Sequence, residues 1–225
     1  MGGSWLQSLV VRGPGADVRA FQKAAASREK PEYSTVRPQV RTQRLSFVKL
    51  RALLPSRAAK TLSGDVEEPW DLVIEAPRRR KDGSLEVTYR FQLGKSEPDD
   101  LIVAVSKIFP RLCFVVGCVA PAVDEQSSRL VLNGRSWRWQ LSARRKKTIC
   151  AKVPKETEDN ADEVTWALAE ADWAMMDDVV AHWRPRVDKL TARVLGKASA
   201  RRDTRVASAH RRRSSRTGRA AARSR

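Results

Sequence analysis

Alternation of hydrophobic and polar residues is clearest between positions 85 and 93. In this segment, LEVTYRFQL, every second residue is large and apolar, and the residues between are charged or polar. A period of two is typical of a strand that buries one face. Asp82 and Gly83 lie just before it, after an apolar run at 70–76, so the sequence predicts a β-hairpin here.

The segments on either side of this hairpin complete an α+β pattern. The further predicted elements are a strand at 5–12, a helix at 17–26, a short helix at 56–62, a helix at 98–109, a buried strand at 112–119 and a second hairpin at 129–141 around Asn133 and Gly134. One helix follows the first strand and another follows the third. This order predicts a ferredoxin-like split βαβ domain with an antiparallel sheet.

A long amphipathic helix is predicted over 161–183, and Pro185 separates it from a second helical stretch at 186–195. Apolar residues recur along the first helix at spacings of three or four: Val164, Leu168, Ala171, Met175, Val179 and Trp183. Two interpretations of this stripe, which also includes Trp166, Trp173 and Met176, remain open. Either it covers the protein's own sheet, or it docks on a protein partner.

These elements divide the chain into four parts: a ferredoxin-like α+β domain at 1–142, a charged linker at 143–160, an acidic amphipathic helical segment at 161–195 and an Arg-rich tail at 196–225. The tail consists mainly of Arg, Ala and Ser. It has too few large apolar residues to bury a core, so it is expected to be disordered.

The net charge of the chain indicates what kind of partner it binds. The 225 residues include 44 Lys and Arg against 26 Asp and Glu, a formal net charge of +18. Residues 193–225 contain 12 basic residues and one acid, whereas 156–178 contains nine acids and no base. Such an excess of positive charge implies a polyanionic partner, because each Lys or Arg placed on a phosphate releases condensed counterions.

The tail is therefore the first candidate site for nucleic acid. Its arginines are Arg201, Arg202, Arg205, Arg211, Arg212, Arg213, Arg216, Arg219, Arg223 and Arg225. Arginine pairs with phosphate through two parallel hydrogen bonds and stacks on bases, which lysine does not. We predict binding to a DNA or RNA backbone. A tail used for solubility or targeting, including nuclear import, is the alternative.

A second candidate lies on the predicted strand after Gly134. Arg135, Trp137 and Trp139 share one face there, and exposed aromatic rings beside arginine would stack on single-stranded bases. Alternatively, both tryptophans pack against helices. Two basic runs extend these candidates. One follows the strand and consists of Arg144, Arg145, Lys146 and Lys147. The other is the hairpin turn at 78–81, which either contacts phosphate or is simply solvated.

Catalytic and metal-binding patterns are absent from the sequence. The two histidines, His182 and His210, lie apart, and no Gly-x-Ser-x-Gly, P-loop or His-Glu-x-x-His pattern occurs. Cys113 and Cys118 lie five residues apart on one predicted strand, so they face opposite sides and cannot share a metal ion. We therefore expect a non-enzymatic protein with no metal, no cofactor and no small-molecule substrate.

The cysteine content and the absence of long apolar runs bear on the compartment. Three cysteines without a Cys-x-x-Cys pair argue against a secreted disulfide framework. No apolar run of about 18 residues and no signal-peptide pattern is found. These features predict an intracellular protein without a membrane partner, cytoplasmic or nucleoid-associated, or nuclear in a eukaryotic host.

The segment FQLGKSEPDDLIVAVSKIFPRLCFVVGCV, residues 91–119, is similar to the Leu-Ser-x-x-Phe-Pro-x-Leu-x-Phe pattern of the YubB-type ferredoxin-like domain family. The sequence Leu-Ser-Phe at 45–47 with Pro55 after it, and Trp70, match as well. The resemblance covers about residues 4–141, although Ser-Trp-Leu stands at 4–6 where the family has Trp-Cys-Asn. It implies a ferredoxin-like fold of a kind found on plasmids and phages, mostly without an assigned function.

Composition and resemblance together predict an accessory protein of ribonucleoprotein or mobile-element type that binds phosphate backbone through its tail. The alternative is a protein–protein interaction module. In that case the helix at 161–183 binds a partner or forms a homodimer, and the tail serves targeting or solubility.

Overall fold

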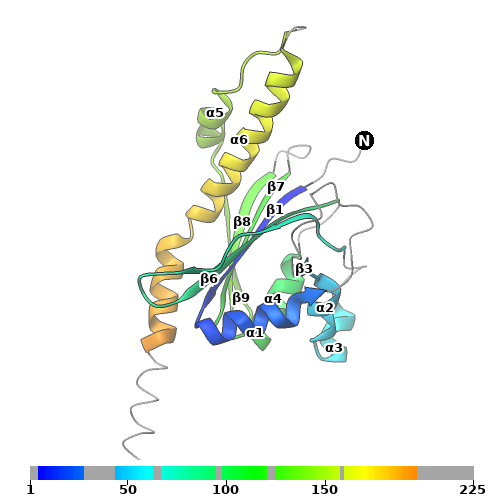
Figure 1. Ribbon diagram of the computed structural model, residues 1–225, viewed down its shortest axis with the longest axis vertical. Helices are drawn as coiled ribbons and strands as arrows, with labels where there is room; N and C mark the ends of the chain where they lie inside the picture. The colour runs from blue at the N-terminus through cyan, green and yellow to red at the C-terminus, as the bar shows by residue number, and fades with distance from the viewer. Residues whose placement is uncertain are drawn as a thin grey trace, which may run out of the picture.

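The computed structural model describes residues 5–27, 44–62, 67–94, 98–120, 125–157 and 160–196. These residues form an α+β fold in which helices cover both faces of a seven-stranded antiparallel sheet (Figure 1). The strands of the sheet are β1 (Trp5–Gly13), β4 (Trp70–Ile74), β5 (Arg78–Arg79), β6 (Leu85–Leu93), β7 (Cys113–Ala120), β8 (Glu125–Leu132) and β9 (Arg135–Gln140). The predicted α+β class is confirmed, and the fold is larger than a simple ferredoxin-like domain.

The sheet has the order β4-β6-β1-β7-β8-β9, and β5 pairs with β6 beside this row. β1 therefore lies at the centre, antiparallel to both β6 and β7. β7 is buried along its whole length, as the unbroken apolar run predicts. In β6 the apolar positions from Val87 onward are buried and the polar positions between them are half-buried, which confirms the period of two.

Helices α1 (Gly15–Ala25), α2 (Phe47–Ala52) and α4 (Asp99–Ile108) pack on one face of the sheet. The core there contains four fully buried phenylalanines, Phe21, Phe47, Phe91 and Phe114. The rings of Phe21 and Phe114 meet edge to face with centroids 5.4 Å apart, a favourable arrangement for aromatic pairs. The short helix α3 (Ser56–Thr61) borders this layer, where β2 (Ala26–Ser27) also pairs with β3 (Arg44–Leu45).

The opposite face is covered by α6 (Ala161–Ala181) and by a further helix at 184–196, which follows a turn at 182–183. Met175, Met176 and Val179 of α6 belong to the core on this face. The helix approaches closely at Gly117 of β7, where an added Cβ would lie 2.7 Å from Met176 Sδ. The apolar face of the long helix thus covers the protein's own sheet.

The N-terminal half of α6 extends past the sheet, and α5 (Ala143–Cys150) packs against it (Figure 1). α5 occupies part of the segment 143–160 that was predicted as a linker. Only Ile149 of α5 is buried, so no hydrophobic period marks this helix in the sequence. Leu168, predicted on the buried stripe of α6, is instead 50% exposed, because this part of the helix lies beyond the sheet.

The turn between β8 and β9 confirms the second predicted hairpin. Asn133 and Gly134 have φ angles of 47° and 75°. Positive φ at both central residues is the requirement of a type I′ turn, which the Asn-Gly pair satisfies with little strain.

Candidate nucleic-acid interface

A buried arginine holds the turn between β5 and β6 against helix 184–196. Only 6% of the Arg12 side chain, on the central strand β1, is exposed. Its guanidinium nitrogens lie 2.8 Å from a carboxylate oxygen of Asp82 in the turn and 2.5 Å from one of Asp188 in the helix. The Thr191 hydroxyl donates a hydrogen bond of 3.0 Å to Asp82. Three segments far apart in the sequence therefore meet in one charged cluster.

Asp82 is the central acceptor of this cluster. Burial acts to raise the pKa of its carboxyl group, but hydrogen bonds from Ser84, Arg12 and Thr191 outweigh it and lower the pKa to about 2. The Ser84 amide and hydroxyl donate to the carboxylate at 2.9 and 2.5 Å. Asp82 is thus ionised at neutral pH and fixes the turn beside the helix.

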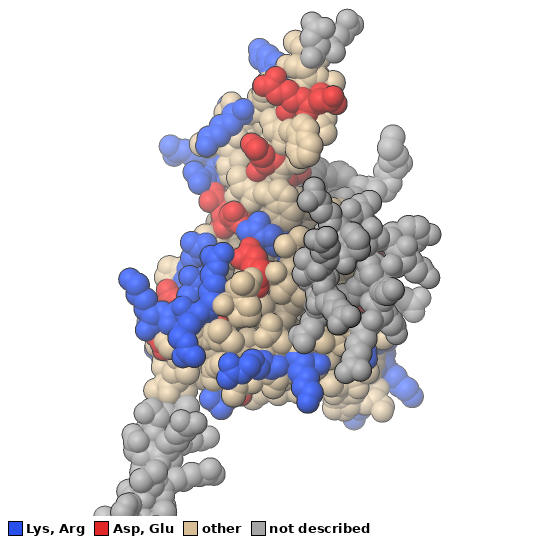
Figure 2. Space-filling view, in the orientation of Figure 1, with Lys and Arg blue, Asp and Glu red and all other residues tan. Residues whose placement is uncertain are grey.

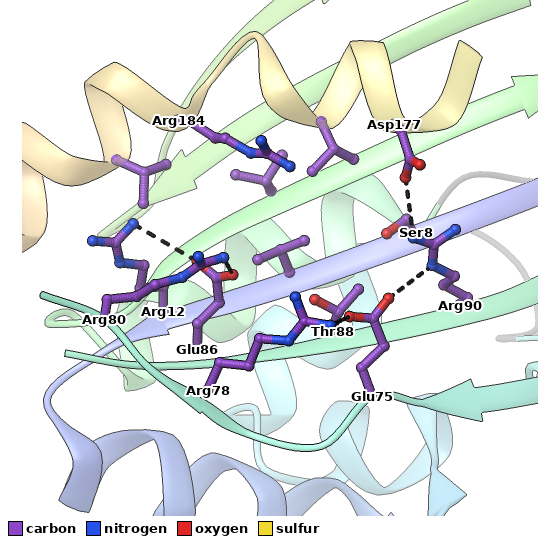
Figure 3. Close-up of a pocket in the computed structure, with 14 residues that line it drawn as sticks. Ser8, Arg12, Glu75, Arg78, Arg80, Glu86, Thr88, Arg90, Asp177 and Arg184 are labelled. Carbon is purple, nitrogen blue, oxygen red and sulfur yellow. Dashed lines mark hydrogen bonds and ion pairs between the residues drawn. The ribbon is translucent and has the colours of Figure 1, made fainter. Parts of the chain in front are cut away.

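A cleft of about 220 Å³ lies between this hairpin and the helices on the same face of the sheet (Figure 3). Five arginines, three carboxylates, two hydroxyl residues and four valines line it: Arg12, Arg78, Arg80, Arg90, Arg184, Glu75, Glu86, Asp177, Ser8, Thr88, Val10, Val115, Val180 and Val187. The sheet forms its floor, where Ser8, Val10 and Thr88 alternate with residues that point into the opposite core. Hairpin arginines form one wall, and α6 with helix 184–196 forms the other.

Arg90 of β6 bridges this cleft. Its guanidinium lies 3.0 Å from Glu75, which follows β4, and 3.0 Å from Asp177 on α6. The same guanidinium lies 5.1 Å from the centre of the Trp173 ring, within the range of a cation–π contact. Arg90 therefore links the outer strands of the sheet to the helix.

Two other arginines of the cleft keep hydrogen-bond donors unused. Arg80 pairs with Glu86, but its Nε–H is buried and meets no acceptor among the described residues. Arg184 forms no ion pair with any part of the chain that the structure describes. Its guanidinium reaches from helix 184–196 into the cleft, while Arg78 reaches in from the hairpin side (Figure 3).

Lys and Arg side chains gather on the face where the hairpin crosses the C-terminal helices (Figure 2). Arg78, Arg79 and Lys81 of the hairpin are exposed, and so are Arg184 and Arg186 of the helix. The basic turn of the sequence thus lies on the same surface as the helix that leads into the tail.

Trp137 and Trp139 of β9 each place one ring face against a residue of the C-terminal helical region. The Trp139 ring stacks on His182 with centroids 4.2 Å apart and an angle of 9° between the planes. The Arg186 guanidinium lies 4.2 Å from the centre of the Trp137 ring. Both tryptophans are half-buried and pack against the core around Trp183. This arrangement favours packing over base stacking for the two rings.

The basic run at 144–147 lies on α5, and Arg135 is exposed at the start of β9. Arg145 donates hydrogen bonds of 2.5 and 3.2 Å to Asp178 of α6, and the hydrogen bonds to this carboxylate raise the arginine's pKa. α5 therefore neutralises part of the acidic run on α6.

The ten tail arginines from Arg201 to Arg225 lie outside the described residues. Helix 184–196 is the last described element before them. Thr191 joins this helix to the hairpin and Asp188 joins it to Arg12, so the last described helix lies beside the basic face.

The described residues contain no group of three or more His, Cys, Asp or Glu side chains placed to hold a metal ion. Cys113 packs with Val10 beneath the helices, and burial raises the pKa of its thiol to about 12. Cys118 lies 3.3 Å from the Gln7 amide nitrogen that donates to it, on the other side of the sheet. The two thiols face opposite sides, as predicted. Of the described helices, none has both the length and the apolar character needed to cross a membrane.

Comparison of the chain with models of protein families, with curated proteins and with solved structures finds no match. The cleft is the feature that sequence reasoning missed, because its arginines come from strands and helices up to 172 residues apart. A signal for it was present in β6. Glu86, Thr88 and Arg90 occupy its polar positions, and these line the cleft.

Proposed function

We propose that this chain is a non-enzymatic accessory protein that binds nucleic acid, with its Arg-rich tail on the phosphate backbone. The position of the helix that precedes the tail carries the proposal. Thr191 and Asp188 attach the helix that precedes the tail to the hairpin and to Arg12. The last described helix before the tail is therefore fixed beside the basic hairpin.

Charge and residue type support phosphate as the partner. The net charge of +18 favours a polyanion, and arginine supplies almost all of the tail's positive charge. Paired N–H donors of arginine match two phosphate oxygens at once. The exposed hairpin residues Arg78, Arg79 and Lys81 extend this surface onto the folded part.

Fluorescence anisotropy with labelled single- and double-stranded oligonucleotides tests the proposal on the full chain. In one variant, all ten tail arginines are replaced by Gln; in a matched control, they are replaced by Lys. We expect the Gln variant to lose at least tenfold in affinity and the Lys variant to keep most of it, because phosphate binding depends mainly on charge. Equal affinity of the Gln variant and the unmodified protein would refute the role of the tail.

We also infer that a ferredoxin-like core lies within the larger sheet. β1, α1, β4, β6, α4 and β7 follow the β-α-β-β-α-β order of that fold. Helix α1 leads from β1 to β4, and β6 lies between these two strands in the sheet. Helix α4 leads from β6 to β7, and β1 lies between them. This order supports the resemblance to the YubB-type family. The β8–β9 hairpin and the C-terminal helices are additions.

One observation favours a second function, protein–protein interaction through α6. Trp166 is 74% exposed and Leu168 is 50% exposed, on the half of the helix that extends past the sheet. As residues i and i+2 of a helix they point to different sides of it, and an exposed tryptophan on a projecting helix favours a contact with another protein. Sedimentation velocity of the full chain and of the Trp166→Ala variant tests homodimer formation. A dimer that the substitution converts to monomer supports this function, and a monomer in both cases rules out the homodimer.

A further inference from the structure

The arginine-lined cleft combines two surfaces that a nucleotide needs. Its rim offers charged donors, and its floor and helix wall include Val10, Val115, Val180 and Val187. Ligand pockets are typically mostly apolar with a few polar groups that fix orientation. Val10, Val115 and Val187 belong to the core beneath the helices, so the half-buried Val180 is the apolar side chain that the cleft leaves for a ligand.

The donors of the cleft exceed the acceptors that its own carboxylates supply. Each guanidinium carries five N–H donors; the lining has three carboxylates for its five arginines, and Asp82 and Asp188 beside it pair with Arg12. Arg184 has no ion-pair partner among the described residues. The buried Nε–H of Arg80 also lacks an acceptor there. These two arginines leave donors for an incoming anion.

The placement of the arginines suits a phosphate group. Arg184 and Arg78 reach toward the cleft from opposite walls, so an anion between them receives donors from both sides (Figure 3). Arginine binds phosphate oxygens in a bidentate manner. Glu75 and Glu86 pair with Arg78 and Arg80, so the arginines of the hairpin wall are neutralised when the cleft is empty, whereas Arg184 on the helix wall is not paired within the described part of the chain.

We propose that this cleft binds one nucleotide of the nucleic acid, with its phosphate between Arg184 and Arg78 and its sugar or base against Val180, the half-buried valine of the lining. The volume of about 220 Å³ is below the roughly 300–1,000 Å³ of common small-molecule sites, so it suits part of one nucleotide and not a longer segment. The inference rests on the proposed function in one respect, since it takes the nucleotide to be a unit of the bound strand.

Nuclear magnetic resonance of the ¹⁵N-labelled full chain tests the proposal with three probes: adenosine monophosphate, inorganic phosphate and adenosine. The readout is the shift of the amide signals of Thr88 and Val187, which line the cleft. We expect saturable shifts with adenosine monophosphate, at least threefold weaker binding of inorganic phosphate, and no shift with adenosine. Equal affinity for phosphate and the monophosphate would overturn the apolar contact, and no shift with either would overturn the site.

Two variants locate the binding. Arg184→Gln removes an exposed side chain, so the fold is retained, and it should weaken binding of adenosine monophosphate about tenfold or more, as loss of a charged hydrogen bond does. Arg57→Gln on α3 removes the same charge from an exposed site on the opposite side of the sheet and should leave the affinity unchanged. An equal effect of both substitutions would show that only net charge matters and would contradict the proposal.

The failure of this proposal can be told apart from failure of the proposed function. If Thr88 and Val187 do not respond while the tail Gln variant loses oligonucleotide binding, the cleft proposal is wrong and the tail function stands. If they respond but the tail variant binds oligonucleotides as well as the unmodified protein does, the cleft proposal stands and the tail function is wrong.

Discussion

Thr191 and Asp82, 109 residues apart in sequence, are joined by a hydrogen bond of 3.0 Å from the threonine hydroxyl to the carboxylate. Arg12 reaches the same carboxylate from the central strand at 2.8 Å. One short side chain in a β-turn thereby connects the sheet, the basic hairpin and the helix that precedes the tail. The shape of the candidate interface depends on this connection.

The Asp82→Asn substitution should lower the free energy of unfolding by about 2 kcal/mol at pH 7. The charge that Arg12 and Ser84 stabilise is lost, and the pKa of about 2 in the folded protein, against an ordinary value of 3.8, corresponds to roughly that energy. Urea denaturation measures it. Glu156→Gln, at an exposed position, is the control and should have an effect within about 0.5 kcal/mol.

The contribution of the Asp82 carboxylate to the free energy of unfolding should decrease as the pH falls. Because folding lowers the pKa of Asp82, the stabilisation is complete above about pH 4 and is lost as the pH falls toward 2. The stability difference between the unmodified protein and Asp82→Asn should therefore shrink over that range. A difference that stays constant from pH 5 to pH 2 would contradict the assigned pKa.

The Gly117→Ala substitution should destabilise the packing of α6 on β7. The added Cβ would lie 2.7 Å from Met176 Sδ and 2.9 Å from Val180 Cγ2, and such overpacking costs about 1–3 kcal/mol. Gly15→Ala is the matched control, since its nearest neighbours would lie 3.6 Å or more away. Thermal unfolding of both variants measures the effect; equal melting temperatures would mean that α6 does not approach the sheet as described.

The two tryptophans Trp183 and Trp166 should differ sharply in their contribution to stability. Trp183 is 5% exposed and donates a hydrogen bond of 2.8 Å to the Ser128 hydroxyl, so Trp183→Ala should cost about 3–5 kcal/mol. Trp166→Ala, at a position 74% exposed, should change the free energy of unfolding by less than about 0.5 kcal/mol. Urea denaturation of both variants is the measurement, and equal losses would be inconsistent with the positions of α6 and of the turn at 182–183 that follows it.

His182 should titrate below its ordinary pKa of 6.5, because the rings of Trp139 and Trp183 shield one part of this otherwise exposed imidazole from water and so disfavour its charged form. The unfolded chain then binds more protons, so the stabilisation is complete above about pH 6.5 and decreases as the pH falls below it. Proton NMR of the imidazole signals measures the pKa, with His210→Gln used to assign the two histidines. A pKa at or above 6.5 would show that the Trp139 ring stabilises the charged imidazole more than burial penalises it.

Local patterns predicted much of the fold. Strand β6 and the turn at Asn133 and Gly134 depend on alternation and on turn chemistry, which adjacent residues carry by themselves. α5 could not be found this way, because it is polar on nearly all sides and is held by the neighbouring α6. The exposure of Leu168 depends on where the sheet ends, which the helical period does not contain.

The candidate site was less predictable than the fold. The charge of the tail is visible in composition, but the cleft forms only when Arg12, Arg90 and Arg184 are brought together by strand pairing and helix packing. The environment of the β9 tryptophans could not be predicted either, because their spacing in the sequence does not reveal that His182 and Arg186 contact their ring faces.

The dependence of oligonucleotide affinity on salt tests the central claim most directly. For about six phosphate contacts on a single strand, the logarithm of the binding constant should fall with the logarithm of salt concentration with a slope near −4. The variant with Gln at all ten tail positions should lose most of this slope, and the Lys variant should keep it. A flat salt dependence of the unmodified protein, or the same slope after replacement of the tail arginines by Gln, would contradict the account.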